Sequence, residues 1–325
     1  MVKNIKIKKI HQDTMCCEPL LVKGKEGELL CICQCDGPEE PHKDNREYVF
    51  RSYDNGDTWT KKERLIPETG RAEYATGVYK TNEEIAVFFS TQSKGWYSPE
   101  DWKCNIIKSF DEGATWQDCG DSPIFANDTF IRTSVKISDT EILVPYHTYH
   151  KNKDNNFYMV ESGVLKTTDN HKTYKRYPAH IMDLEIINDC IWLEPTLAVL
   201  SDGTIVMIMR RNGTGWYWSC ESKDGGETWS ETVRTNIPNP SCKPKLLNID
   251  NGRIALIHTP NNIIGHRYPL SLWISDDDMK TWGEKIELTN FPGTYHYPDG
   301  FYEDGHIKFT IEYDRNMILY FDIEL

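Results

Sequence analysis

The sequence predicts an all-β fold, a six-bladed β-propeller of four-stranded antiparallel blades formed by residues 1–325 as a single domain. The first reason is an eight-residue turn, Ser/Thr-x-Asp-x-Gly-x-Thr-Trp, whose five copies lie 53 to 58 residues apart and are marked by Asp54, Asp111, Asp169, Asp224 and Asp277. So regular a period indicates repeated supersecondary units. The second reason is that apolar residues alternate at strand spacing, while helical periodicity is absent almost everywhere. The third reason is that the chain contains six inner-strand segments, one more than the number of repeated turns, which indicates six units.

The repeated turn has a structural role in this interpretation. Its Asp can accept backbone N–H bonds, its Gly supplies a positive φ, and its Trp packs between neighbouring blades. The third and fifth copies lack the Gly, and the third has Tyr174 in place of Trp. These turns predict architecture rather than chemistry.

The strand of the first unit, residues 29–35, carries Cys31, Cys33 and Cys35 at alternate positions. Their side chains therefore leave one face of the strand, where small buried thiols fit well. No paired CxxC spacing accompanies them, so we expect reduced cysteines, no zinc site and no cofactor, although an acid-rich funnel could hold a structural cation.

The fourth unit shows the order of strands within a blade. Residues 192–200 predict a strand, 201–203 a tight turn and 204–210 the returning strand. A third strand follows at 215–221, and after the repeated turn the fourth strand begins at 231–234. This order predicts an up-and-down antiparallel blade.

Six inner-strand segments align with one another. They are residues 18–22, 74–78, 131–135, 194–198, 243–247 and 297–301. The last unit has room for only two further strands, 307–313 and 317–323, so we expect the N-terminal segment 6–10 to supply its outer strand and close the ring.

The net charge of −13 disfavours a nucleic-acid partner, because a polyanion would be repelled at long range. The N-terminal residues alternate in a strand pattern without an apolar signal-peptide core, and no long apolar run predicts a membrane span. We therefore expect a cytoplasmic protein that does not bind a membrane. Long loops at 36–46, 93–102 and 149–157 are candidate binding segments, and Trp96, Tyr97 and Trp102 suit a sugar-stacking rim.

Polar and ionisable residues stand at the starts of the inner strands, where a purely structural strand would be apolar. They are Glu18, Glu73, Arg132, Glu194, Lys243, His296 and Tyr297. In a propeller these positions converge on the central funnel, and burying many charges there is costly without a function. The alternative is a solvated channel mouth lined by compensating ion pairs.

The repeated turn on a six-unit all-β chain resembles the sialidase (neuraminidase) superfamily over nearly the whole chain. A sharper similarity lies in residues 194–212, where a Glu heads the strand, the turn ends in Asp-Gly, and an Arg followed by Asn closes the returning strand. The resemblance implies that Glu194 assists the nucleophile and that Arg210 binds the substrate carboxylate. Arg211 is the alternative to Arg210.

The resemblance implies further roles in other units. Arg267 matches a second carboxylate-binding Arg. Tyr297 matches the nucleophile, with Tyr295 as its alternative. The general acid/base is expected on the long loop of the first unit, at Asp44 or, as second choice, Asp36.

These residue types form a coherent chemistry. A sialic acid carries a carboxylate on its anomeric carbon, so a neutral phenol avoids the repulsion that a carboxylate nucleophile would meet. Tyr is a weak nucleophile at its free pKa and needs a base such as Glu194. Arg guanidinium groups can hold a carboxylate bidentately. We therefore expect an exo-glycosidase acting on a small carbohydrate that ends in an acidic sugar, with Arg132, Glu18, Lys243 and His296 as further substrate-binding residues.

One departure from the family concerns the first unit. Sialidases begin this inner strand with Arg-Ile-Pro, whereas here Cys17 and Glu18 precede Pro19. One carboxylate clamp is missing, which extends the expected substrates to other acidic or neutral sugars. The candidates to replace it are Arg132, Arg71, Arg46 and Lys243.

Two other functions remain open from the sequence. A uronate lyase would use a Tyr or His to abstract a proton and an Arg to neutralise a carboxylate. The candidates for this proton transfer are five histidines and one tyrosine near strand ends: His147, Tyr149, His150, His258, His266 and His296. A carbohydrate-binding propeller without catalysis is the other alternative, although a binder does not need an activated Tyr.

Overall fold

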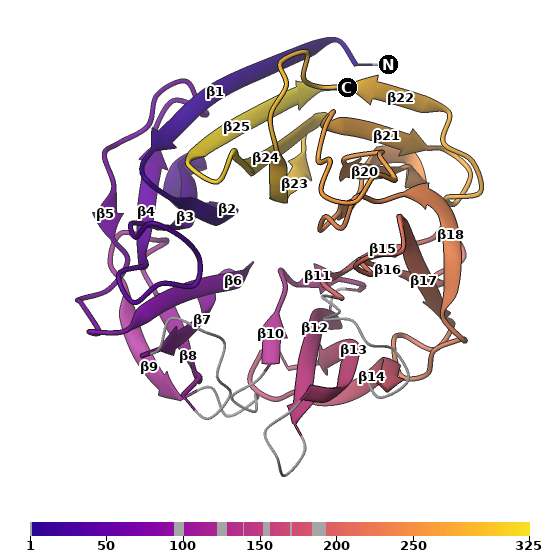
Figure 1. Cartoon of the computed structure of the whole chain (residues 1–325), viewed down its shortest axis with the longest axis horizontal. Coiled ribbons are helices and arrows are strands. Elements are labelled where there is room, and N and C mark those ends of the chain that lie inside the picture. The colour runs from indigo at the N-terminus through magenta and orange to yellow at the C-terminus, as the bar shows by residue number, and fades with distance from the viewer. Residues whose placement is uncertain are drawn as a thin grey trace. The chain divides into compact units, whose positions relative to one another are not determined.

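The structure is a computed structural model that describes residues 2–93, 101–121, 129–138, 140–151, 157–169, 171–183 and 193–325. It contains six antiparallel sheets, the blades of a six-bladed β-propeller (Figure 1). The only helical turns among the described residues are two 3-10 segments, Lys25–Gly27 and Asp250–Gly252. No helix in this part of the chain is long and apolar enough to cross a membrane. The chain divides into two compact units of three blades each, residues 1–127 with 296–325 and residues 128–295.

The first unit contains the blades at both ends of the chain. One blade consists of β2 (Cys16–Lys23), β3 (Leu29–Cys35), β4 (Arg46–Ser52) and β5 (Glu63–Arg64). The next consists of β6 (Ala72–Lys80), β7 (Ile85–Gln92), β8 (Lys103–Ser109) and β9 (Gln117–Asp121). The last consists of β23 (Tyr295–Glu303), β24 (His306–Tyr313), β25 (Met317–Glu324) and the N-terminal β1 (Asn4–Gln12).

The N-terminal strand closes the last blade, as the sequence predicts. Strand β1 runs antiparallel to β25, from the pair Asn4 and Glu324 to the pair Gln12 and Met317, with a bulge between Lys9 and His11. Figure 1 shows the two strands side by side. The blade therefore has four strands although its own segment of chain supplies only three.

The second unit contains the three middle blades. The first consists of β10 (Thr129–Ile131), β11 (Val135–Lys136), β12 (Ile142–Lys151), β13 (Phe157–Thr167) and β14 (Lys175–Asp183). The second consists of β15 (Pro195–Val199), β16 (Ile205–Met209), β17 (Trp216–Ser222) and β18 (Val233–Pro238). The third consists of β19 (Lys245–Asn248), β20 (Ile254–His258), β21 (Ser271–Ser275) and β22 (Glu284–Glu287).

The inner strand of the first of these blades is interrupted where the sequence predicts a continuous strand. Ile131 pairs with Tyr146 and Val135 with Leu143, so three residues lie opposite Val144 and Pro145. Pro145 has no N–H to donate to the ladder, which favours a break at this point. Arg132 is the first residue of the bulge, and its backbone N–H donates to Pro145 O at 2.8 Å.

The repeated turns have the geometry expected from their residue types. In the first, Asp54 accepts the backbone N–H of Thr58 at 2.8 Å and the Thr58 hydroxyl at 2.6 Å. The other four copies repeat both bonds, made by Asp111, Asp169, Asp224 and Asp277. The Trp of the first copy, Trp59, packs edge-on against Tyr320 at 5.5 Å between ring centroids. Each turn is thus fixed by its own Asp.

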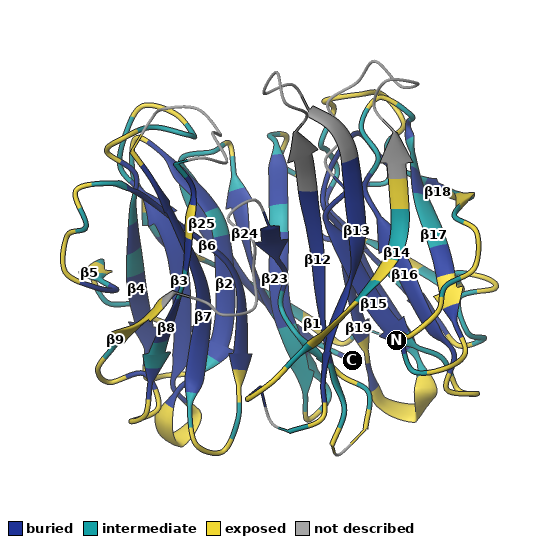
Figure 2. Cartoon of the chain, turned by 90° about the horizontal axis from the view of Figure 1, so that it is seen from below, coloured by how far each residue is buried: buried dark blue, intermediate teal, exposed yellow. Residues whose placement is uncertain are grey.

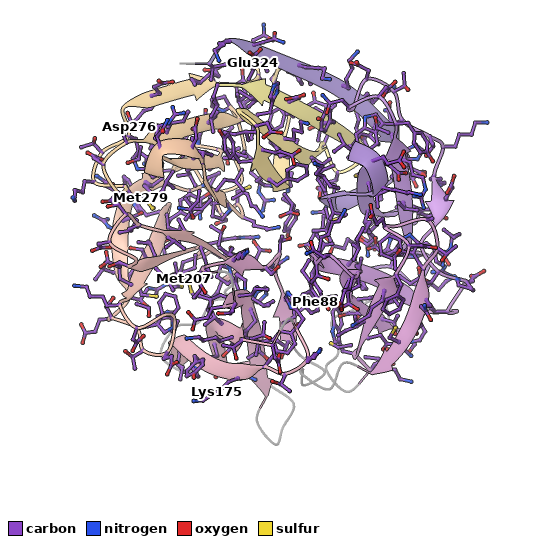
Figure 3. The ribbon with its side chains drawn as sticks, turned by 180° about the vertical axis from the view of Figure 1, so that it is seen from behind. Phe88, Lys175, Met207, Asp276, Met279 and Glu324 are labelled. Carbon is purple, nitrogen blue, oxygen red and sulfur yellow. The ribbon has the colours of Figure 1, made fainter. Side chains whose placement is uncertain are left out.

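The cores lie within and between blades, and the turns lie at the surface (Figure 2). Cys31, Cys33 and Cys35 are fully buried in one cluster with Phe50 and Tyr320, which confirms the expected face of buried thiols. In the second unit, Met207 on β16, labelled in Figure 3, is fully buried. Its sulfur accepts a bond from the Ser162 hydroxyl of the neighbouring blade at 3.7 Å.

Candidate functional site

Three strand heads share an uncommon backbone conformation. Glu18, Glu194 and Tyr297 have positive φ values of 47°, 29° and 54°, and each precedes a proline. Residues with side chains rarely adopt this region, and a following proline normally favours extended backbone. Strain of this kind occurs preferentially at functional sites. All three are site residues that the sequence predicts.

In the second unit, Glu194 is the centre of a buried ion cluster. It is 1% exposed, and its Oε2 accepts a bond from Nη1 of Arg210 at 2.7 Å. Nη2 of Arg132 lies 3.5 Å from Oε1. Asn212 holds the other side of the Arg210 guanidinium by accepting from Nε at 2.6 Å. The Glu, the Arg and the Asn whose spacing predicts a site are therefore in direct contact.

The two guanidinium groups decide the charge of Glu194. Burial raises the pKa of this carboxyl, but Arg210 and Arg132 outweigh that effect and lower the pKa to about 2. Glu194 is therefore a fixed carboxylate over the physiological pH range. It can accept a hydrogen bond throughout that range.

His147 lies in the same unit and is fully buried. Its ring stacks on Phe130 with centroids 4.9 Å apart. Burial, together with the positive charges of Arg132, Arg210 and Lys243, holds the pKa of His147 well below its usual value. The imidazole is therefore neutral, and its burial separates it from solvent.

The blade formed by β19 to β22 adds two cationic residues to the second unit. Lys243 is 5% exposed. Arg267 is partly exposed, and its Nη2 donates to the backbone oxygen of Ser241 at 2.7 Å. Ser241 has a left-handed φ of 68°, and the Arg267 bond fixes the loop that carries Lys243.

In the first unit, the strand heads meet at Glu312, which is fully buried on β24. Its Oε2 accepts from the backbone N–H of Glu18 at 3.4 Å, and its Oε1 lies 3.8 Å from Nδ1 of His296. The ring of His296 stacks on that of Tyr297, with centroids 6.3 Å apart. Glu312 therefore brings Glu18, His296 and Tyr297 into one cluster.

The structure places a guanidinium beside Cys17 that sequence reasoning missed. Nη2 of Arg315, in the turn between β24 and β25, lies 3.5 Å from the Cys17 sulfur. The same nitrogen donates to Oε2 of Glu40 at 2.5 Å, and Nη1 lies 3.7 Å from Oε1 of Glu312. The Cys17 thiol also donates to Glu40, at 3.1 Å. Only a hint existed in the sequence, namely a lone Arg in a turn close to the predicted nucleophile segment.

The other candidates for replacing the missing Arg have different partners. Arg46 pairs with Glu68 at 2.8 Å, and Arg71 pairs with Asp101 at 3.2 Å. Both bonds hold loops of the first unit. Arg132 and Lys243 belong to the second unit.

The loop at 36–46 places its acids in different surroundings. The Asp44 side chain is 53% exposed, and its pKa is lowered by a hydrogen bond from Lys43. Asp36 accepts from the Tyr48 hydroxyl at 2.5 Å and from Lys62 at 2.6 Å. Glu40, on the same loop, is the acid that reaches the Cys17 thiol.

Most of the other residues that the sequence singles out either pack in the core of a blade or lie outside the described residues. His258 is buried edge-on against Trp273 at 4.5 Å, and burial lowers its pKa to about 3. Trp102 is buried and stacks on Tyr74 at 5.3 Å, so it anchors its loop. Trp96 and Tyr97, and the side chains of Tyr149 and His150, lie outside the described residues. Among the described residues, no group of His, Cys, Asp or Glu could hold a metal ion.

Comparison with known proteins places the chain in a family. The BNR repeat-like domain family matches residues 71–308. A sialidase of Paraclostridium sordellii is 23% identical over 308 residues, which cover 82% of this chain and 72% of that protein.

Two solved structures have the same fold. A protein of unknown function from Dyadobacter fermentans matches with a TM-score of 0.77 and 15% identity, covering 99% of both chains. The Hadza microbial sialidase Hz136 matches with a TM-score of 0.77 and 17% identity over 97% of this chain and 66% of that one. The family match and the sialidase relative confirm the resemblance to the sialidase superfamily, and the chain belongs to the BNR repeat-like domain family.

Proposed function

We propose that this protein is a sialidase-type exo-glycoside hydrolase that removes a terminal acidic sugar from a small carbohydrate. The observation that carries the proposal is the strained backbone shared by Tyr297, Glu194 and Glu18 at strand heads. In this proposal Tyr297 is the nucleophile, and Glu194 accepts the hydrogen bond of its phenol. Arg210 and Arg267 bind the substrate carboxylate, with Arg132 and Lys243 adding positive charge around them. Glu18 and His296 bind other parts of the sugar.

The reaction proceeds in two displacements. The phenolic oxygen of Tyr297 attacks the anomeric carbon and passes its proton to Glu194 as the bond to the leaving oxygen breaks, and a loop carboxylic acid donates its proton to that oxygen. Water, deprotonated by the same loop carboxylate, then displaces the tyrosine and releases the free sugar, and the tyrosine oxygen takes its proton back from Glu194. Asp44 is the acid expected from the family resemblance. Glu40 is a second candidate, because it is held next to Cys17 at the head of β2.

Glu194 suits the supporting role because Arg210 and Arg132 keep it ionised. A fixed carboxylate orients the phenol and stabilises the positive charge that develops at the anomeric carbon during bond cleavage. The buried ion pairs hold this carboxylate in one position, so little reorganisation is needed when the substrate reacts.

The direct test replaces Tyr297 by Phe and measures turnover of aryl glycosides of sialic and uronic acids. We expect kcat to fall by roughly 100- to 10,000-fold, since the nucleophilic oxygen is lost while binding groups remain. Tyr295→Phe is the matched control, because the Tyr295 side chain is buried and its hydroxyl donates to Phe291 O at 2.9 Å. Undiminished turnover in Tyr297→Phe would exclude this residue as the nucleophile. An absorbance from an unsaturated uronate would indicate a lyase instead.

A further inference from the structure

The corner around Cys17 in the first unit contains one guanidinium and several acids. Its members are Cys17, Glu18, Glu40, Glu312 and Arg315, and we call them the Cys17 corner. Cys17 and Glu312 are fully buried, and the Glu40 side chain is 11% exposed. The Arg315 side chain, by contrast, is 38% exposed. The only guanidinium in the corner is therefore more accessible than the Glu40 and Glu312 carboxylates that contact it.

The position of Arg315 is set by its own backbone and by its acidic neighbours. Its φ of 57° follows that of Asp314, 50°, in the tight turn between β24 and β25. From this turn the side chain reaches the sulfur of Cys17 on β2, 298 residues away in sequence. Glu40 and Glu312 then hold the guanidinium from two sides.

We propose that Arg315 is a specificity-determining residue that binds an anionic group of the substrate at the Cys17 corner. The inference rests on the proposed function and adds to it a third guanidinium, supplied by a turn rather than by the head of the inner strand. A guanidinium has five N–H donors in a planar fork. Glu40 contacts Nη2 and Glu312 contacts Nη1, and the exposed part of the fork can receive a carboxylate.

The size of Cys17 is part of this arrangement. An arginine at position 17 would compete with Arg315 for the same space and the same two carboxylates. The small thiol leaves room for the Arg315 guanidinium and donates a hydrogen bond to Glu40. A substrate carboxylate that approaches Arg315 meets Glu40 as an internal competitor, so removal of the Glu40 charge should tighten the binding of an acidic sugar.

The experiment measures the affinity of the full chain for free N-acetylneuraminic acid and for its methyl ester by calorimetry. Neither ligand carries a glycosidic bond, so turnover does not interfere. In Arg315→Asn we expect the acid to bind roughly 10- to 100-fold more weakly, while the affinity for the ester is nearly unchanged. Asn tolerates the left-handed conformation, so the turn is kept. Arg315→Lys keeps the charge but loses the fork, and an intermediate loss is expected.

Three further variants complete the design. Cys17→Arg combined with Arg315→Asn returns a guanidinium to the corner. This double variant should recover at least half, on a logarithmic scale, of the lost preference for the acid over its methyl ester. Glu40→Gln should tighten binding of the acid, whereas the exposed neighbour Glu39, changed to Gln, should not. Arg253→Asn removes an Arg paired with Asp250 at 2.6 Å in the other unit, and controls for the loss of one positive charge.

The proposal is overturned if the unmodified protein does not distinguish the acid from the ester, or if Arg315→Asn weakens both equally. Failure of the proposed function would appear differently, as absent hydrolysis of aryl glycosides with the acid preference of Arg315 intact.

Discussion

At the scale of single residues, the cluster of Glu194, Arg210 and Arg132 shows why buried charges must be considered together. A lone buried carboxylate would be strongly destabilising, and so would a lone buried guanidinium. Here the shortest contact, 2.7 Å, joins Arg210 to Glu194, and Arg132 is a more distant second partner at 3.5 Å. Arg210 therefore contributes more than Arg132 to holding the carboxylate. The ion pairs fix the position and the charge of Glu194 as much as they stabilise the fold, because a buried ion pair adds little free energy of folding over apolar residues of similar size.

Replacing Arg210 by Met should lower the free energy of unfolding by about 3–5 kcal/mol, because Glu194 would remain buried with only its weaker partner. The measurement is chemical denaturation at neutral pH. Arg211→Met is the matched control. Arg211 is partly exposed and stacks over Trp218 at 4.2 Å, so its loss should cost about 1 kcal/mol or less. Equal losses in the two variants would contradict the assignment of Arg210 as the main partner of Glu194.

At the scale of elements, the repeated turn explains why glycine recurs at its fifth position. Gly56 has a φ of 85°, and a Cβ added to it would lie 2.1 Å from Cε1 of Tyr320 in the adjoining blade of the same unit. The turn therefore approaches its neighbour more closely than any side chain permits. In the third and fifth copies His171 and Met279 occupy this position with φ values of 66° and 62°. These copies keep the left-handed backbone but cannot make the same close approach.

A comparison of Gly56→Ala with Gly27→Ala separates the need for a left-handed backbone from the need for space beside Tyr320. Gly27 has nearly the same φ, 86°, but a Cβ there would meet nothing within 4 Å. Both variants incur the cost of a left-handed alanine, whereas only Gly56→Ala forces Tyr320 to move. We expect the Gly56 variant to be less stable than the Gly27 variant by about 1–3 kcal/mol in equilibrium denaturation. Indistinguishable losses would mean that backbone conformation alone selects this glycine.

At the scale of the whole molecule, the repeat allows the fold to be predicted, but it says little about the site. Five turns and a leftover N-terminal strand were sufficient for six blades, because spacing and alternation are local properties. The bulge at Arg132 was missed because it depends on Pro145 in the next strand. Arg315 was missed for a stronger reason. It reaches Cys17 only after the first and last segments of the chain have formed neighbouring blades, and its left-handed turn is not visible in the residue types.

The five Asp turns, spread over both units, should determine how the whole chain responds to acid. Hydrogen bonds from the Thr hydroxyl and the backbone N–H of the turn lower the pKa of Asp54, Asp111 and Asp169 to about 2, and those of Asp224 and Asp277 are also lowered. An unfolded Asp has a pKa of about 3.9. A carboxyl with a lower pKa in the folded state stabilises the fold fully above the unfolded value, and this contribution is lost as the pH falls towards the folded value.

Asp54→Asn should therefore lower the Tm of the protein at neutral pH, and the difference from the unmodified protein should shrink between pH 4 and pH 2. Both proteins become less stable in this window, but only the unmodified one loses the charge of Asp54, so the two curves of Tm against pH converge. Asp276→Asn removes the same charge from an exposed Asp at the variable second position of the fifth turn and controls for the change in net charge. A gap for Asp54→Asn that stayed constant or widened towards pH 2 would show that the turn depends on the shape of the side chain rather than on its charge.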